Sequence, residues 1–353
     1  MDLEERLSLV REVGEEIITE EDLKQLFEAK RRPVAYDGFE PSGKIHIAQG
    51  ILRAINVNKM VKAGCTFKMW IADWHAWANN KMGGDFGKIQ KAGDYMVEVW
   101  KASGMDTSKV KFFWASDVMG DKTYWEKVMK ISINSTLNRV IRCSQIMGRK
   151  ENEILSASQI FYPCMQAADI FHLGIDIAQL GMDQRKVNVF AREIAPKLGY
   201  AKPVAVHHHM LLGLNELKTE AQGIDRKIEL KMSKSRPDSA IFMTDSREEI
   251  ERKMRKAYCP EKVAVENPVL EYCRYIVFEK FKEMKIERPQ KFGGNISFHS
   301  YEALENAFVS GILHPMDLKT GTAHYINKLI EPVRKHFKRN VKARKLLHEI
   351  NSY

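Results

Sequence analysis

VAYDGFEPSG at residues 34–43 decides the fold of this chain. The first six residues of this stretch predict a buried strand, and the four that follow predict a turn. A helical pattern then begins at Ile45 and continues to a stop at Gly64. A strand, a glycine-containing turn and a helix in this order are typical of the opening of a parallel α/β sheet.

The same alternation continues along the first two thirds of the chain. Further strands are expected at about 65–76, 110–115, 175–180 and 203–206. Residues 3–29 predict two helices, and about 121–172 predict a long helical stretch. The sequence therefore predicts an α/β fold, a Rossmann-like, doubly wound parallel sheet with a helical insertion.

Strand signals fade after about residue 245. The segments beyond it are rich in lysine and arginine, and helical patterns occur at 246–257, 268–285, 300–310 and 315–339. We therefore expect two domains, residues 1–245 around the sheet and a helical domain at 246–353.

The composition favours a nucleic-acid partner in a reducing compartment. The chain of 353 residues carries 56 basic and 46 acidic residues, a net charge of +10, which favours a polyanionic partner. Its five cysteines are odd in number and form no CxxC pair, so we expect reduced thiols and no structural zinc. The acidic start resembles no targeting peptide, and no apolar run reaches membrane-spanning length. We expect a cytoplasmic protein with no membrane contact.

KMSKS at residues 231–235 packs two lysines and two hydroxyls into five positions. Because Pro237 disfavours a continued helix, we expect a mobile loop. Lysine places a compact charge and three donors on a flexible stem, which suits a phosphate that moves during a reaction. An identical pentapeptide arises by chance in about one chain of this length in ten thousand. A solvated basic loop is the simpler alternative.

The turn after the first strand has the features of a phosphate cradle. Gly38 and Gly43 let the backbone approach a ligand closely, and a helix N-terminus attracts negative charge. His46 could donate to a phosphate oxygen there, although it could equally cap an ordinary helix. Gln49 could donate a hydrogen bond but carries no charge.

A polar face is expected on the middle helix. Tyr162, Gln166 and Asp169 stand at i, i+4 and i+7, so their side chains share one face among apolar neighbours. Such groups are costly to bury without partners, unless the face meets solvent. Gln184 follows the strand at 175–180, and Tyr36 lies on the first strand. The carboxyl ends of these strands are where ligands bind in open α/β sheets.

On these residues the sequence resembles the tyrosyl-tRNA synthetases of the archaeal and eukaryotic type, which are class I aminoacyl-tRNA synthetases. KMSKS is identical to the signature loop of that class, and the similarity extends through 36–43, 162–166 and 314–319. HIAQG at 46–50 resembles plant and protist members. His46 matches the first of two histidines in the class signature, whereas Gln49 replaces the second.

The resemblance implies a tyrosine site. Tyr36 and Asp169 would hold the phenol oxygen, and the α-amino group would be held by Tyr162, Gln166 and Gln184. A phenol hydroxyl can donate to a carboxylate and accept from another hydroxyl, whereas an indole N–H can only donate, so the pair fits tyrosine better than tryptophan. Phenylalanine would leave both groups unpaired, and a tyrosyl-tRNA synthetase is itself the established example of such rejection.

The resemblance also implies a tyrosine–tRNA ligase, which activates L-tyrosine with ATP and transfers it to the 3′-terminal adenosine of tRNA(Tyr). ATP would be a substrate accompanied by Mg²⁺, with no metal site on the protein. The catalytic groups would be His46, Gln49, Lys231 and Lys234, and ATP would contact Gly38, His46, Lys231, Ser233 and Lys234. Two alternatives remain, a tryptophanyl-tRNA synthetase and a non-catalytic RNA-binding paralogue.

The resemblance assigns the remaining parts of the chain as well. Residues 246–353 would bind the anticodon, and Phe292, His314 and Asp317 match positions that read it, although a packing Phe and an N-capping Asp are the simpler alternatives. Relatives form homodimers through the insertion, here about 116–156.

Two further groups of polar residues have no certain role. Asp73 and His75 are expected either to line the pocket or to cap a structural element. Consecutive residues on a strand point to opposite faces, so the run His207-His208-His209 is a poor chelator of one ion. We expect this run to lie at a strand end near the nucleotide.

Overall fold

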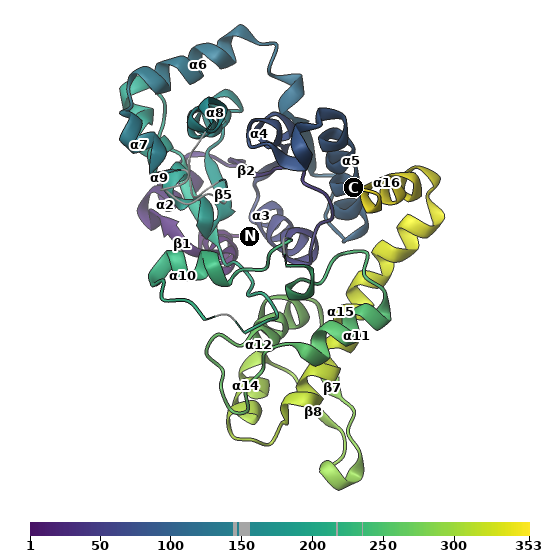
Figure 1. Ribbon diagram of the computed structural model, residues 1–353. Helices are drawn as coiled ribbons and strands as arrows, with labels where there is room; N and C mark the ends of the chain where they lie inside the picture. The colour runs from purple at the N-terminus through teal and green to yellow at the C-terminus, as the bar shows by residue number, and fades with distance from the viewer. Residues whose placement is uncertain (144–146, 148–155, 217, 235) are drawn as a thin grey trace.

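The computed structural model describes residues 1–143, 147, 156–216, 218–234 and 236–353 (Figure 1). At its centre is a six-stranded sheet in the order β1-β6-β5-β2-β3-β4. All neighbouring strands run parallel except β1, which pairs antiparallel with β6. The strands are β1 (Gly14–Ile18), β2 (Val34–Phe39), β3 (Thr66–Ile71), β4 (Val110–Trp114), β5 (Ile177–Gly181) and β6 (Val204–His208).

Helices cover both faces of the sheet, which confirms the doubly wound prediction (Figure 1). One core lies under α1 (Leu3–Val13), α2 (Glu20–Ala29), α3 (Arg53–Lys62) and α5 (Phe86–Ala102). A second core lies under α6 (Lys122–Ile133), α8 (Ala157–His172) and α9 (Arg185–Ile194). The chain order reverses between β2 and β5, and their carboxyl ends therefore form the crevice where such sheets bind ligands.

Glycine stands at two positions in the turn after β2 and the helical turn that follows it. Gly43 has φ +94°, a conformation that L side chains rarely adopt. A Cβ on Gly50, in the helical turn that follows, would lie 2.4 Å from the Met243 Sδ, so a larger residue there would require the Met243 side chain to move. The predicted helix begins here as a π-helical turn, Ala48–Leu52, and continues as α3.

Two predictions about helices need correction. Residues 3–29 form the expected α1 and α2, but β1 lies between them, because Gly14–Ile18 is drawn into pairing with β6 at the sheet edge. Local sequence is a weak guide to such edge pairing. The helical stretch at 121–172 is divided into α6, α7 (Leu137–Ile141) and α8. Part of the predicted insertion, 144–146 and 148–155, lies outside the described residues.

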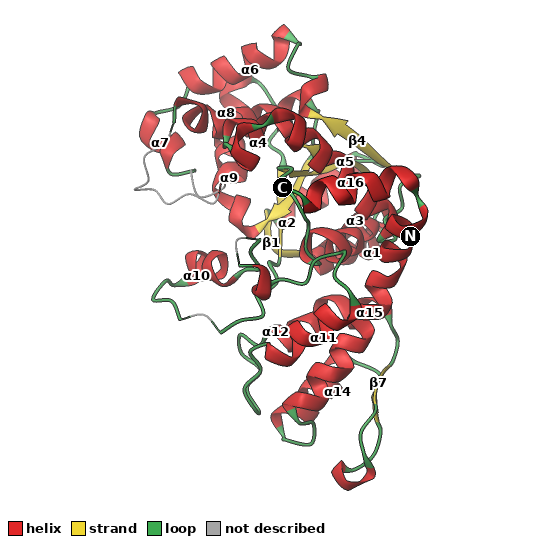
Figure 2. Cartoon of the chain, turned by 45° about the vertical axis from the view of Figure 1, so that its right-hand side comes forward, coloured by secondary structure: helices red, strands yellow, loops and turns green. Residues whose placement is uncertain are grey.

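The C-terminal region is mostly helical, as expected. Its helices are α11 (Arg247–Lys256), α12 (Pro268–Tyr272), α13 (Phe278–Lys280), α14 (Tyr301–Val309), α15 (Pro315–Arg339) and α16 (Val341–Asn351). The helix predicted over 268–285 is wrong at its end, because Met284–Ile286 forms strand β7, which pairs with β8 (Ile296–Phe298). This β7–β8 hairpin projects away from the sheet (Figure 2).

The end of the chain returns to the region around the six-stranded sheet. In Figure 1, α16 lies against α5. The His336 Nε2 of α15 lies 2.7 Å from the Glu98 Oε2 of α5, and the Lys91 Nζ lies 3.1 Å from a Glu349 oxygen of α16. The boundary predicted between residues 245 and 246 is not tested by these contacts and remains a prediction.

None of the described helices is both long and apolar enough to cross a membrane.

Candidate active site

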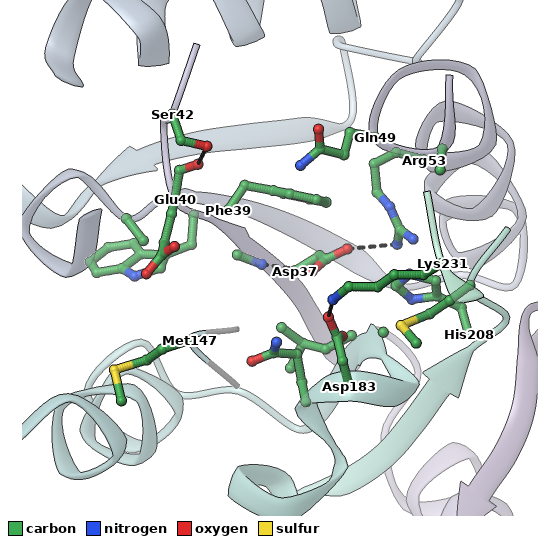
Figure 3. A pocket seen from close by; sticks show the side chains of 18 of the residues that line it. Asp37, Phe39, Glu40, Ser42, Gln49, Arg53, Met147, Asp183, His208 and Lys231 are labelled. Atoms are coloured by element: carbon green, nitrogen blue, oxygen red, sulfur yellow. Dashed lines mark hydrogen bonds and ion pairs between the residues drawn. The ribbon is translucent and has the colours of Figure 1, made fainter. Parts of the chain in front are cut away.

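A cavity of about 650 Å³ opens at the carboxyl ends of β2 and β5. Side chains from β2, the turn after it, β3, α8, β5 and the KMSKS loop line it. Figure 3 shows Glu40 and Ser42 at one end of the cavity, and Arg53, Lys231 and His208 at the other. The cavity therefore lies where the order of the strands predicts a ligand.

Asp169 lies at the centre of one subsite. This carboxylate is 1% exposed, its Oδ1 accepts a hydrogen bond of 2.9 Å from the Tyr124 hydroxyl, and its Oδ2 lies 3.0 Å from the His75 Nε2. Within the described part of the chain, the buried Tyr36 hydroxyl has no hydrogen-bond partner. A carboxylate retains acceptor capacity beyond two contacts, so this subsite offers a hydroxyl and a carboxylate to a ligand that can both donate and accept.

Burial and the Asp169 charge keep the hydroxyls of Tyr36 and Tyr124 protonated. Burial, with the Asp169 carboxylate as the next cause, raises the pKa of Tyr36 and of Tyr124 well above the usual value. Burial alone would lower the pKa of His75, but the Asp169 carboxylate beside it outweighs this effect and the pKa is raised. The phenols stay protonated, and the carboxylate stabilises the charged form of His75.

The other predicted tyrosine ligands lie next to this subsite. The Gln166 Nε2 donates to the Gln184 Oε1 at 3.1 Å, and the ring of Tyr162 stands edge-on to His75 with centroids 5.1 Å apart. Burial, followed by the Glu40 carboxylate, raises the pKa of Tyr162 well above its usual value. The structure therefore brings all five predicted residues to one cavity: Tyr36, Tyr162, Gln166, Asp169 and Gln184. Their roles toward a ligand remain a prediction.

The side chains predicted to bind the phosphates of ATP line the same cavity. The Lys234 Nζ donates to the Ser42 Oγ at 3.1 Å, and the Lys231 Nζ lies 2.5 Å from the Asp183 Oδ2. Two buried atoms of the first turn, the His46 Nδ1 and the Gln49 Oε1, have no hydrogen-bond partner among the residues that the structure describes. Gly38 and Ser233 also line the cavity, whereas Ser235 lies outside the described residues.

Two of these groups have displaced pKa values. Burial, with Lys81 as the next cause, lowers the pKa of Lys234 to about 7. Burial, followed by the charges of Lys234 and Lys231, lowers the pKa of His46 well below its usual value. His46 is therefore a neutral ring that can donate one hydrogen bond, and an arriving phosphate would favour the charged form of Lys234.

A buried ion pair that the sequence analysis missed lies between the subsites. The Arg53 Nη1 lies 2.6 Å from the Asp37 Oδ2 and donates to the Gln179 Oε1 at 2.8 Å. Burial raises the pKa of Asp37 to about 7, against the effect of Arg53. Both side chains line the cavity (Figure 3). In the sequence, the position of Asp37 next to Tyr36 was the one local sign that Asp37 belongs to the site.

Asp73 and His75, the two polar candidates that follow β3, have different positions in the structure. His75 lies in the cavity against Asp169, as described above. Asp73 is turned away to bind backbone, because its Oδ1 accepts from the Trp74 N–H at 2.9 Å and the Ser116 N–H at 3.1 Å. Tyr124, the second partner of Asp169, was missed because it is 45 residues away in the chain.

The three predicted anticodon residues lie far from the cavity along the chain. Phe292 is 59% exposed in the turn of the β7–β8 hairpin, and the His314 Nδ1 accepts from the Met316 N–H as the N-cap of α15. Asp317 lies in the first turn of α15. Arg288 joins the two segments, because it donates to the Gly294 carbonyl at 2.9 Å and the Ile312 carbonyl at 3.0 Å.

Comparison with known proteins supplies the family context for this geometry. Residues 28–331 match the model of the tRNA synthetases class I (W and Y). The chain is 52% identical to the cytoplasmic tyrosine–tRNA ligase 1 of Arabidopsis thaliana, over 100% of this chain and 89% of that protein. It is 42% identical to a tyrosine–tRNA ligase of Saccharolobus islandicus, over 99% of each. The crystal structure of a tyrosyl-tRNA synthetase complexed with L-tyrosine from Pyrococcus horikoshii matches with a TM-score of 0.93 and 42% identity, over 100% of both chains.

Proposed function

Because this chain belongs to the tyrosine–tRNA ligase family of class I tRNA synthetases, we propose that its cavity activates L-tyrosine with ATP and then transfers it to tRNA(Tyr). The observation that carries this proposal is the buried Tyr36 hydroxyl, unpaired among the described residues and close enough to Asp169 for that carboxylate to raise its pKa. A phenol oxygen placed between the two would accept from Tyr36 and donate to Asp169. Neither phenylalanine nor tryptophan can do both.

In the first step the tyrosine carboxylate attacks the α-phosphorus of ATP. A bond forms between the carboxylate oxygen and phosphorus, the bond to the bridging oxygen breaks, and pyrophosphate leaves with the electron pair. No side-chain nucleophile is required, so the protein contributes positioning and charge stabilisation. Lys231 and Lys234 stabilise the departing pyrophosphate from the loop, and His46 and Gln49 bind phosphate oxygens from the first turn.

In the second step the 3′-terminal adenosine of tRNA(Tyr) takes the tyrosyl group. Its hydroxyl oxygen attacks the carbonyl carbon of the adenylate and an ester bond forms. The bond from that carbon to the phosphate oxygen breaks, and AMP leaves with the electron pair while the hydroxyl proton passes to the departing phosphate or to water. The contacts of Asp169 and Tyr36 with the substrate phenol oxygen do not change when the tyrosyl group moves from AMP to the tRNA. The same subsite therefore serves both steps.

Mg²⁺ enters this reaction as part of the substrate MgATP. Over the described residues, no group of three histidine, cysteine, aspartate or glutamate side chains is placed to hold a metal ion. We propose that phosphate oxygens and water supply most of the ligands, because Mg²⁺ keeps several waters and is bound through substrate phosphates in nucleotide-using enzymes.

The direct test is exchange of labelled pyrophosphate into ATP with single amino acids. We expect exchange with tyrosine, and little with tryptophan or phenylalanine. Exchange with tryptophan alone would identify the chain as a tryptophanyl-tRNA synthetase, the other amino-acid specificity of the family. No exchange with any amino acid, in protein that binds tRNA, would identify a non-catalytic paralogue.

We further propose that two copies associate through α6 in the cytoplasm. Trp125, Met129 and Ile133 repeat every four residues on one exposed face of α6, and Leu137 extends this face. The side chain of Ile133 is 76% exposed, which is costly for an isoleucine with no partner.

Ile133→Glu should therefore convert the homodimer to a monomer. A carboxylate at the centre of an apolar interface would be desolvated without a partner, which costs several kcal/mol. Light scattering at micromolar concentration measures the mass. Val341→Glu is the matched control, since Val341 is an exposed aliphatic residue on α16. A wild-type protein that is already monomeric, or an Ile133→Glu variant that stays dimeric, contradicts the proposal.

We also propose that the β7–β8 hairpin and the start of α15 read the anticodon. Phe292→Ala should raise the KM for tRNA about tenfold, because stacking of a base on an aromatic ring contributes about 1–3 kcal/mol. Tyrosine-dependent pyrophosphate exchange needs no tRNA and should not change. Val265→Ala, at another exposed apolar position, is the control and should alter neither measurement. A Phe292→Ala variant with wild-type aminoacylation removes Phe292 from the site.

A further inference from the structure

The three histidines at the end of β6 have separate partners. The His207 Nδ1 lies 2.8 Å from the Glu16 Oε2, and the His208 Nδ1 lies 2.8 Å from the Gln179 Nε2. These rings therefore belong to two different polar contacts, both within the sheet region. His209 differs, because it contacts both the sheet edge and the C-terminal helices.

His209 is held between two carboxylates. Its Nδ1 lies 3.2 Å from the Glu15 Oε2 on β1, and its Nε2 lies 3.2 Å from the Glu271 Oε2 on α12. The ring also stacks on Tyr275, with centroids 4.3 Å apart and planes inclined by 15°. The Nδ1–Glu15 contact is a hydrogen bond, whereas the Nε2–Glu271 contact has ion-pair distance without hydrogen-bond geometry. Because the two carboxylates lie at opposite nitrogens of one ring, the charged imidazolium attracts both of them.

The surrounding charges favour that charged ring. Burial would lower the pKa of His209, but the contacts with the Glu15 and Glu271 carboxylates raise it to about 9. The contact with His209 likewise lowers the pKa of Glu15 to about 2, with a further contribution from Lys227 on α10 (Gly223–Leu230). The groups that face His209 are thus Glu15, Glu271 and Tyr275, with Lys227 behind Glu15.

This cluster, Glu15, His209, Lys227 and Glu271, supports the base of the KMSKS loop. The Glu271 Oε2 also accepts from the Leu212 N–H at 3.0 Å. The adjacent backbone holds the loop, because the Met232 N–H donates to the Leu211 carbonyl at 2.9 Å and the Gly213 N–H to the Leu230 carbonyl at 2.8 Å.

The other side of the loop is tied to the same cluster. Lys227 lies on α10, the helix that leads directly into residue 231, and forms an ion pair with Glu15. Both the segment that receives the loop and the helix that precedes it are therefore connected through one imidazolium.

We propose that His209, as an imidazolium between Glu15 and Glu271, is a positioning residue that holds Lys231 and Lys234 in register for adenylate formation. This inference rests on the proposed function. Without the charged ring, Glu15 and Glu271 repel each other and the 211–214 segment loses its support. The lysines then sample more positions, and the rate of the phosphoryl step falls while the tyrosine subsite is unchanged.

The test is a double-mutant cycle of His209→Gln and Glu271→Gln, followed by pyrophosphate exchange. We expect each single variant to lower kcat about tenfold with the KM for tyrosine unchanged, and the double variant to lose little more than either. Non-additivity of this kind marks residues that act as one unit. Glu271→Gln keeps an amide oxygen for the Leu212 N–H, and retained tyrosine binding shows that each variant is folded. The control is His348→Gln at an exposed position on α16.

The pH dependence of activity distinguishes a positioning role of charged His209 from a role in packing alone. His209 loses its charge as pH rises through about 9, so the ratio of wild-type to His209→Gln activity should fall toward one between pH 8 and pH 10. Hydrogen exchange at the Met232 amide, which needs no activity, should accelerate in the variant. A constant activity ratio with unchanged amide exchange overturns this inference. A wild-type protein without tyrosine-dependent exchange overturns the proposed function instead.

Discussion

Lys234→Ala should slow tyrosine-dependent pyrophosphate exchange on the order of a hundredfold or more, because one preorganised donor to transition-state charge contributes about 3 kcal/mol. Lys234 lines the cavity beside Ser42, and burial of its ammonium leaves little water to screen the charge that develops on pyrophosphate. Tyrosine affinity should barely change, since the Tyr36–Asp169 subsite is formed by other elements. Equal exchange rates in the variant and the wild type would remove Lys234 from the reaction.

Two controls sharpen this result. Lys234→Arg keeps the charge and should retain a large part of the activity, whereas Lys342→Ala, at an exposed position on α16, should have none of the effect. The depressed pKa of about 7 also predicts a pH effect. Since the lysine loses its proton as pH rises through about 7 in the free protein, kcat/KM for ATP should fall over that range. At saturating ATP the phosphates restore the charge, so kcat should hold to higher pH.

Asp169→Ala should have the second largest effect, on the choice of amino acid. The change removes the acceptor proposed for the substrate phenol and leaves the Tyr124 hydroxyl and the His75 Nε2 without the carboxylate. A hydrogen bond to a charged group contributes about 1.5–3 kcal/mol, which corresponds to roughly a 10- to 150-fold loss. We expect at least this loss in kcat/KM for tyrosine, with less change for phenylalanine, so discrimination between the two should narrow.

Exchange assays with tyrosine and phenylalanine measure this selectivity. Tyr124→Phe is the matched control, because it removes one partner of Asp169 and leaves the substrate contact in place. Its effect on discrimination should be clearly smaller than that of Asp169→Ala. Unaltered selectivity in the Asp169→Ala variant would mean that this buried carboxylate only orders Tyr124 and His75.

The predictable part of the site lay in short segments. Gly38 lies on β2 and His46 soon after it, Lys231 and Lys234 share one loop, and spacing along one helix aligns Gln166 with Asp169. The helix face follows from periodicity, and the turn and the lysine loop follow from short motifs of neighbouring residues. The Arg53–Asp37 pair was not predictable, because it joins α3 to β2 through packing of a helix on the sheet.

The sequence by itself determined the alternation of strands and helices, the glycine-containing turn after β2 and the polar face of α8, because each depends on residues that are close neighbours in the chain. Only the tertiary structure decided that Tyr124 and His75 converge on Asp169, that Gly14–Ile18 is a strand, and that His209 connects β1 to α12. Those contacts join distant segments, and their geometry is fixed by the packing of the whole sheet and its helices, which no local pattern encodes.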